Sequence, residues 1–152
     1  MTLVVVGVLA TIGATVMSGG FRNYFLGREI AQDDAQGRLA LERMARELRA
    51  VRSTADLNIG IANQVSFTDV VGDSIAYRRN AGTSQLERLG VSGTYQPLAD
   101  NVSDLQITYL QNDGKTPETT TPGNVYYITV LLTISTQNAN ASYRSTFKPV
   151  VF

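Results

Sequence analysis

The first 21 residues of the chain, Met1–Phe21, carry no charged side chain, and the first charge comes at Arg22. The run consists mostly of Val, Leu, Ile, Ala, Gly and Thr. Because an α-helix rises about 1.5 Å per residue, about 20 such residues span the roughly 30 Å hydrocarbon core of a bilayer. The sequence therefore predicts that residues 1–20 form a helix that crosses a membrane once.

Two other interpretations of this run stay open. A cleaved secretory signal begins with Lys or Arg and has a shorter apolar core. No basic residue precedes this run, although Ser18-Gly19-Gly20 imitates a cleavage site. A buried helix of a soluble core normally keeps one polar face, which the run lacks. The membrane-spanning helix fits the composition best.

The polar segment 21–53 continues the helical spacing after the glycine pair Gly19-Gly20, a potential hinge. Its apolar positions follow one another at intervals of three, four and seven residues, which places them on one side of a helix. They are Ile30, Gly37, Leu41, Met44, Leu48 and Val51. We expect Leu41, Met44, Leu48 and Val51 to pack against a sheet.

Charged side chains occupy the other faces of this second segment. Glu42 and Arg46, like Arg43 and Glu47, are spaced for i,i+4 ion pairs, and Arg49 suits the negative end of the helix dipole. These five side chains are candidates for salt bridges between subunits. The chain as a whole has 13 basic and 13 acidic residues. We therefore expect no nucleic-acid partner.

From Leu57 onward the apolar period changes from helical spacing to two, the period of a half-buried strand. Gly72-Asp73 separates two short alternations and indicates a hairpin. The longest alternation runs from Tyr126 to Ile134 and predicts a central strand, whereas Pro149 places the last one at a sheet edge or a bulge. A helix followed only by strands makes no parallel crossovers. We expect an α+β fold with an antiparallel sheet over residues 57–152.

These segments together resemble the type IV pilin superfamily. The resemblance rests on the uncharged N-terminal helix, the amphipathic phrase RLALERMARELRAVRS (residues 38–53) and the later segments NVSDLQITYLQNDG, YYITVLLTIS and YRSTFKPVVF. The phrase LERMARELR is most similar to the minor pilin and pseudopilin branch, which includes the J-type pseudopilins of type II secretion and the PilW-type and MshO-type minor pilins. The resemblance implies a pilin-like fold, with the long helix packed on a C-terminal β domain.

The family's N-terminal processing motif is absent from the chain. Members have a leader that ends in Gly, then a Phe-Thr-Leu-like start and a nearby Glu, whereas Val4, Val5 and Val6 stand here where that Glu is expected. Our hypothesis is that MTLVVVGVLATIG continues a GFTLIE-like stretch, so that Met1 lies several residues inside the mature helix.

The resemblance implies a structural role without catalysis. Such a prepilin-derived subunit resides in the inner membrane by a single pass, with its β domain in the periplasm or outside the cell. It then enters a cell-envelope fibre, either a type IV pilus or a type II secretion pseudopilus, with other pilin-like subunits as partners. Small side chains permit close helix packing, and Gly7, Ala10, Gly13 and Ala14 are the candidate assembly residues. That these residues merely face lipid is an equally open interpretation.

Catalytic readings find little support, because the chain has no Cys, His or Trp. These absences remove thiolates, neutral-pH bases and the usual zinc ligands. Ser145 and Lys148 match a Ser-x-x-Lys pattern, but odd spacing in a strand separates their faces. Asp113 and Glu118 are weak candidates for Ca²⁺. We expect no enzyme, cofactor, metal or small-molecule substrate. The alternative function is a membrane-anchored domain that recognises a ligand through residues 112–124.

Overall fold

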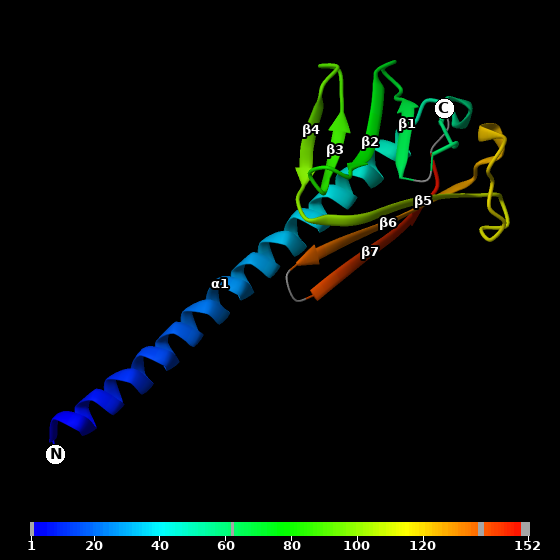
Figure 1. Ribbon diagram of the computed structural model, residues 1–152. Coiled ribbons are helices and arrows are strands. Elements are labelled where there is room, and N and C mark those ends of the chain that lie inside the picture. Colours follow the sequence, from blue (N-terminus) through cyan, green and yellow to red (C-terminus); the bar gives the residue numbers. More distant parts are fainter. Residues whose placement is uncertain (1, 62, 137–138, 150–152) are drawn as a thin grey trace. The chain divides into compact units, whose positions relative to one another are not determined.

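The computed structural model describes residues 2–61, 63–136 and 139–149, with helical side chains described from Met17 onward except Ser18. The fold is α+β, as the sequence predicted: one long helix, α1 (Thr2–Arg49), precedes two antiparallel sheets (Figure 1). The chain divides into two compact units, Met1–Gln32 and Asp33–Phe152. The second unit therefore begins inside the helix.

The helix runs through Gly19 and Gly20 without a break. It ends at Arg49 instead of continuing to Ser53, because the chain there takes up other hydrogen bonds. Val51 forms an isolated antiparallel bridge with Asp69. The Ser53 side chain then accepts the N–H of Ala55 and caps the short 3₁₀ helix η1 (Thr54–Asp56). Serine at this cap is favoured because its oxygen satisfies an N–H that would otherwise lack a partner.

The first sheet is a four-stranded meander in the order β1-β2-β3-β4. Its strands are β1 (Gln64–Thr68), β2 (Ser74–Asn80), β3 (Gln85–Leu89) and β4 (Tyr95–Ala99). The predicted hairpin at Gly72-Asp73 is confirmed, since β1 pairs with β2 in antiparallel register. Gly72 has φ +102°, a conformation that residues with a Cβ rarely adopt.

The second sheet has the order β5-β6-β7. Its strands are β5 (Val102–Leu110), β6 (Tyr127–Thr136) and β7 (Ala139–Phe147). The long apolar alternation is the central strand β6, as predicted, and it is buried on both faces at Ile128, Thr129 and Val130. The last strand, β7, lies at the edge of this sheet, which is one of the two positions predicted for it.

One prediction about the sheet was wrong: the strands form two sheets and not one. The sequence also gave no sign of β3 and β4, whose residues QLERL and YQPLA carry few apolar side chains in alternation. Polar side chains are frequent in these two strands because most of β4 and part of β3 are only partly buried or are exposed. Tertiary packing fixed these two strands where the local pattern was too weak.

The core of the second unit joins the end of the helix to both sheets. Met44, Leu48 and Val51 are fully buried, and Leu41 packs beside them, half-buried. From the strands come mainly β-branched, leucine and aromatic side chains, which are Val65, Phe67, Ile75, Tyr77, Leu86, Leu105, Ile107, Tyr109, Ile128, Val130, Leu132, Ile134 and Phe147. The helix stripe therefore lies in the centre of one hydrophobic core.

Candidate functional site

The first unit carries an exposed apolar face in its described part. Met17, Phe21, Tyr24 and Phe25 are each more than 60% exposed. Met17, Gly20, Phe21 and Tyr24 line a shallow groove of about 420 Å³. Their i, i+3, i+4, i+7 spacing is the set of four residues that receives one side chain of a neighbouring helix when helices pack together.

The groove is uncrowded at Gly20, because a Cβ there would meet nothing within 4 Å. Sequence analysis missed the aromatic face, since it followed the stripe that starts at Ile30. The signal was present in the spacing of Met17, Phe21 and Tyr24.

The predicted assembly residues Gly7, Ala10, Gly13 and Ala14 lie in α1, but their side chains fall outside the described residues. The same holds for most of the run predicted to cross a membrane. Within the part of the chain whose side chains are described, no helix is long and apolar enough to span a bilayer.

A half-buried polar network, which we call the junction network, fixes the helix on the first sheet. Glu47 accepts hydrogen bonds from the Tyr77 hydroxyl at 2.7 Å, from Arg88 Nε at 2.8 Å and from Arg43 Nε at 3.1 Å. Tyr77 lies in β2 and Arg88 opposite it in β3. Hydrogen bonds to a charged group are stronger than neutral ones, so this network sets how α1 lies on the sheet.

The electrostatics of the junction network follow from burial and pairing. Burial acts to raise the pKa of Glu47, but hydrogen bonds from Arg88, Tyr77 and Arg43 outweigh it and lower the pKa. Burial and the hydrogen bond to Glu47 raise the pKa of Tyr77. Glu47 is therefore held as a carboxylate and Tyr77 as a neutral donor.

The five residues that were predicted to form salt bridges between subunits differ in their contacts. Arg43 and Glu47 form the expected i,i+4 pair, but Glu47 also bonds within its own domain. Glu42, Arg46 and Arg49 are exposed and form no ion pair with any described residue. They line a groove of about 360 Å³ between α1 and β7. This groove leaves three of the five candidates available to a partner.

A second polar contact joins the start of the second unit to the other sheet. Asp33 is buried and accepts a hydrogen bond from Asn101 Nδ2 at 3.0 Å. Asp34 accepts from the Tyr143 hydroxyl and from Arg38. The bond from Tyr143 lowers the pKa of Asp34, while burial and Asp34 raise the pKa of Tyr143 to about 12. Sequence analysis singled out neither aspartate, because no local pattern marks their distant partners.

Helix and second sheet approach closely at Gly37. A Cβ built there would lie 2.5 Å from Ile134 Cδ1, which is closer than side chains approach one another. The sequence placed Gly37 on the packing stripe, and the contact explains why no larger residue stands there.

The acidic side chains considered for chemistry hold loops together. The Glu118 carboxylate accepts hydrogen bonds from the N–H groups of Thr121 and Thr120. These bonds, with smaller contributions from the Thr120 hydroxyl and Gln111, outweigh the effect of burial and lower the pKa of Glu118 to about 2. Asp113 accepts the N–H groups of Lys115 and Thr116. Among the described residues no three acidic side chains gather as a metal site. The carboxylates of the 112–124 loop thus serve its own backbone.

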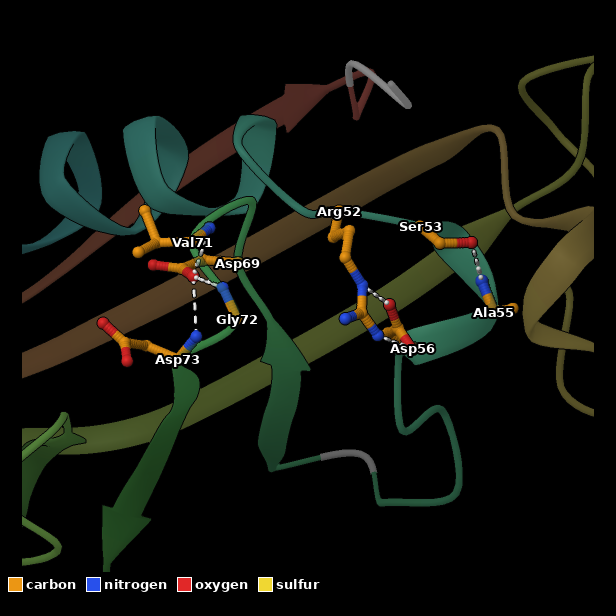
Figure 2. A network of polar contacts seen from close by, with 8 residues as sticks. All are labelled: Arg52, Ser53, Ala55, Asp56, Asp69, Val71, Gly72 and Asp73. Carbon is orange, nitrogen blue, oxygen red and sulfur yellow. Dashed lines mark hydrogen bonds and ion pairs between the residues drawn. The ribbon is translucent and has the colours of Figure 1, made fainter.

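The turn between β1 and β2 is built in the same way (Figure 2). The Asp69 carboxylate accepts the N–H groups of Val71, Gly72 and Asp73 at 2.8–2.9 Å. Arg52 nearby forms two hydrogen bonds to Asp56, at 3.0 and 3.1 Å. Asp69 therefore acts as a turn residue whose carboxylate serves the backbone of its own turn.

Comparison of the chain with family models, with curated proteins and with solved structures gave no match.

Proposed function

We propose that this chain is a non-catalytic structural subunit, a minor pilin or pseudopilin, of a type IV pilus or a type II secretion pseudopilus. One observation carries the proposal: the single helix α1 (Thr2–Arg49) has two different surfaces. Its residues from Ala40 to Leu48 supply buried side chains to a β-domain core, whereas Met17, Phe21, Tyr24 and Phe25 are exposed. A helix with these two parts suits a subunit that assembles through its N-terminal end.

The exposed apolar face supplies a driving force for assembly. Each Å² of apolar surface removed from water contributes about 25 cal/mol, and three aromatic rings and a methionine are available on this face. In the membrane or against other pilin-like subunits these side chains lose their contact with water. The proposal therefore has the subunit stored in the inner membrane and transferred to an envelope fibre, its partners being further pilin-like chains.

The junction network also supports the role of a fibre subunit. A fibre subunit has to keep its globular domain on the helix while the helix changes partners. Glu47, Tyr77 and Arg88 tie the helix to two strands by hydrogen bonds of 2.7 and 2.8 Å. Half-buried polar groups that are paired in this way favour one arrangement of the helix and the strands.

Cysteine cross-linking in cells of the source organism tests the proposal, because the chain has no Cys of its own. Single variants Met17→Cys and Tyr24→Cys place a thiol on the exposed helix face. Ser92→Cys is the matched control, exposed in the turn between β3 and β4. After oxidation we expect disulfide-linked species in the sheared envelope fraction for both helix variants and little for the control. Monomer alone at both helix positions contradicts the proposal.

A second test addresses the small-residue stripe. Gly7→Leu combined with Ala14→Leu is expected to impair assembly, because bulky side chains keep helices apart. Fibre yield in the sheared fraction measures the effect. An unchanged fibre yield would show that these small residues do not belong to the assembly surface. The exposed aromatic face would then be the contact between subunits.

A further inference from the structure

The described sheets have four outer edges, and three of them are protected. Edge strands attract other strands because their N–H and C=O groups lack partners, so proteins cover or interrupt them. The outer edge of β1 is covered by the segment after the helix: Arg52 N–H bonds Thr68 O at 3.0 Å and Asn58 N–H bonds Ser66 O at 2.9 Å. Strand β4 is short and contains Pro97.

The edge of β5 is covered at its C-terminal end. Glu118 N–H bonds Tyr109 O at 2.8 Å, and Gln111 N–H bonds Thr116 O at 2.9 Å. An isolated bridge between Leu110 and Pro117 belongs to the same cover. Residues 111–118 therefore shield the C-terminal end of the β5 edge, in the same way as residues 52–58 shield the outer edge of β1.

The outer edge of β7, which is nine residues long (Ala139–Phe147), is open in the described part of the chain. It pairs with β6 on one side, and no described strand pairs with the other. Asn140, Ala141, Ser142, Arg144 and Thr146 are all exposed. This long, proline-free strand has the form that accepts an added strand.

A groove runs beside this strand, on the face that carries Tyr143 and Ser145. Its volume is about 360 Å³, and Leu41 and Ala45 of α1 supply its apolar surface. Side chains alternate between the two faces of a sheet. Every second side chain of a strand added to β7 would therefore point to the side of Tyr143 and Ser145, over this groove.

The charges along the groove are mainly basic. Arg46 and Arg49 are exposed and have no ion pair with any described residue, against one carboxylate, Glu42. Arg38 also lines the groove, but Asp34 neutralises it at 3.0 Å. On the opposite face of β7 the single charge is Arg144. Like charges on facing strands are destabilising, so pairing of β7 with β7 of a second copy is disfavoured.

We propose that the open edge of β7 binds an extended, acidic segment of a partner protein, which adds as a fourth strand of this sheet with its carboxylates over Arg46 and Arg49. Main-chain hydrogen bonds supply the pairing, and the two arginines select the partner's charge. The site does not depend on the assembly role of the N-terminal helix, because all its residues lie in the second unit.

Peptide binding to the full chain tests the proposal. The probe is a fluorescent peptide of about nine residues, the length of β7, with alternating threonine and glutamate. The matched probe has lysine in place of glutamate. The variant R46E/R49E is compared with R22E/R28E, whose arginines are also exposed but lie in the first unit. Circular dichroism and thermal unfolding verify that each variant is folded, and R46Q/R49Q repeats the test without charge reversal.

We expect the acidic peptide to bind the wild type and R22E/R28E alike, and R46E/R49E at least about tenfold more weakly. The lysine peptide should instead prefer R46E/R49E. Hydrogen exchange should show new protection of β7 amides in the complex, which charge attraction alone does not give. Absence of binding up to millimolar peptide, binding that R46E/R49E leaves unchanged, or binding without protection of β7 each overturns the proposal.

Discussion

Met17 and Met44 belong to the same helix, yet the first is 68% exposed and the second is fully buried. Both side chains are equally apolar, so the difference lies in their neighbours. Met44 belongs to a core cluster with leucine, valine and aromatic side chains of both sheets, while Met17 lies beside an open groove in the described part of the first unit. The comparison teaches that an apolar helix face is a core element in one unit and an unoccupied contact surface in the other.

Charged side chains repeat this contrast. In the second unit, Glu47, Glu87, Arg78 and Arg88 all take part in ion pairs with partners close in space. In the described part of the first unit, Arg22, Arg28 and Glu29 form none. These four side chains of the second unit are paired within their own unit, whereas the three in the first unit are left to solvent or to a partner.

The largest expected effect distinguishes the two methionines directly. Met44→Ala should lower the free energy of unfolding by about 2–5 kcal/mol, because it leaves a cavity in the core. Met17→Ala should change it by less than about 0.5 kcal/mol, since that side chain is exposed. Denaturant unfolding followed by circular dichroism measures both. A similar loss for the two variants would show that the Met17 face is packed in the free chain.

The next effect compares two glutamates. Glu47→Gln should cost about 1–3 kcal/mol, because a charge-assisted acceptor of Arg88, Tyr77 and Arg43 is lost. Glu29→Gln, exposed in the first unit, is the matched control and should be near neutral. Thermal unfolding measures both variants. An unchanged midpoint of thermal unfolding for Glu47→Gln would show that the junction network does not hold the helix on the sheet.

The same glutamate predicts a pH dependence. The pKa of Glu47 is lowered by folding, so its contribution to stability is present above the unfolded value of about 4.5 and is lost as pH falls through the folded pKa. Unfolding measured between neutral and acidic pH should show this loss in the wild type and a smaller one in Glu47→Gln. Parallel curves would contradict the assignment.

Two glycines should respond with opposite signs. Gly37→Ala should destabilise the second unit by roughly 1 kcal/mol, because overpacking against Ile134 exceeds the gain in helix propensity. Gly20→Ala has free space around its Cβ and should raise helix content in the first unit. Thermal unfolding checks the first and far-UV circular dichroism the second. Stabilisation by Gly37→Ala would mean that helix and sheet are less closely packed there.

The smallest effect concerns the 112–124 loop. Glu118 has a pKa of about 2, so the loop should keep its ionised side chain until pH falls well below the usual range for glutamate. Its contribution to stability is present above the unfolded value of about 4.5 and is lost as pH falls toward about 2. A carboxyl NMR titration measures this pKa directly. Titration of Glu118 near 4.5 would show that the Thr120 and Thr121 N–H groups do not hold it.

Sequence reasoning was most successful where one periodicity covered many residues. The stripe of Met44, Leu48 and Val51 and the alternation of β6 are both long, so single exceptions do not disturb them. It failed at β3 and β4, each only five residues long and rich in polar side chains. Short strands at half-exposed positions carry no periodic signal, because their burial depends on which strand lies beside them.

The candidate sites divide along the same line. Local spacing predicted the Arg43–Glu47 pair, because both residues lie on one helix face. It did not predict the hydrogen bonds of Glu47 with Tyr77 and Arg88, which are separated from Glu47 by 30 and 41 residues. It predicted an edge position for the last strand, but not that the outer edge of β7 is left uncovered by every described segment, since that depends on which distant segments lie beside it.

The sequence by itself determined the order of a long helix followed by strands, the apolar face of that helix and the absence of Cys and His chemistry. These properties follow from residue type and spacing, which act over a few neighbouring positions. Only the tertiary structure decided that the strands form two sheets, that Glu47 is enclosed by three donors and that Arg46 and Arg49 stand free beside β7. Contacts between distant segments depend on how the whole core packs, and that packing is a cooperative property of the folded chain.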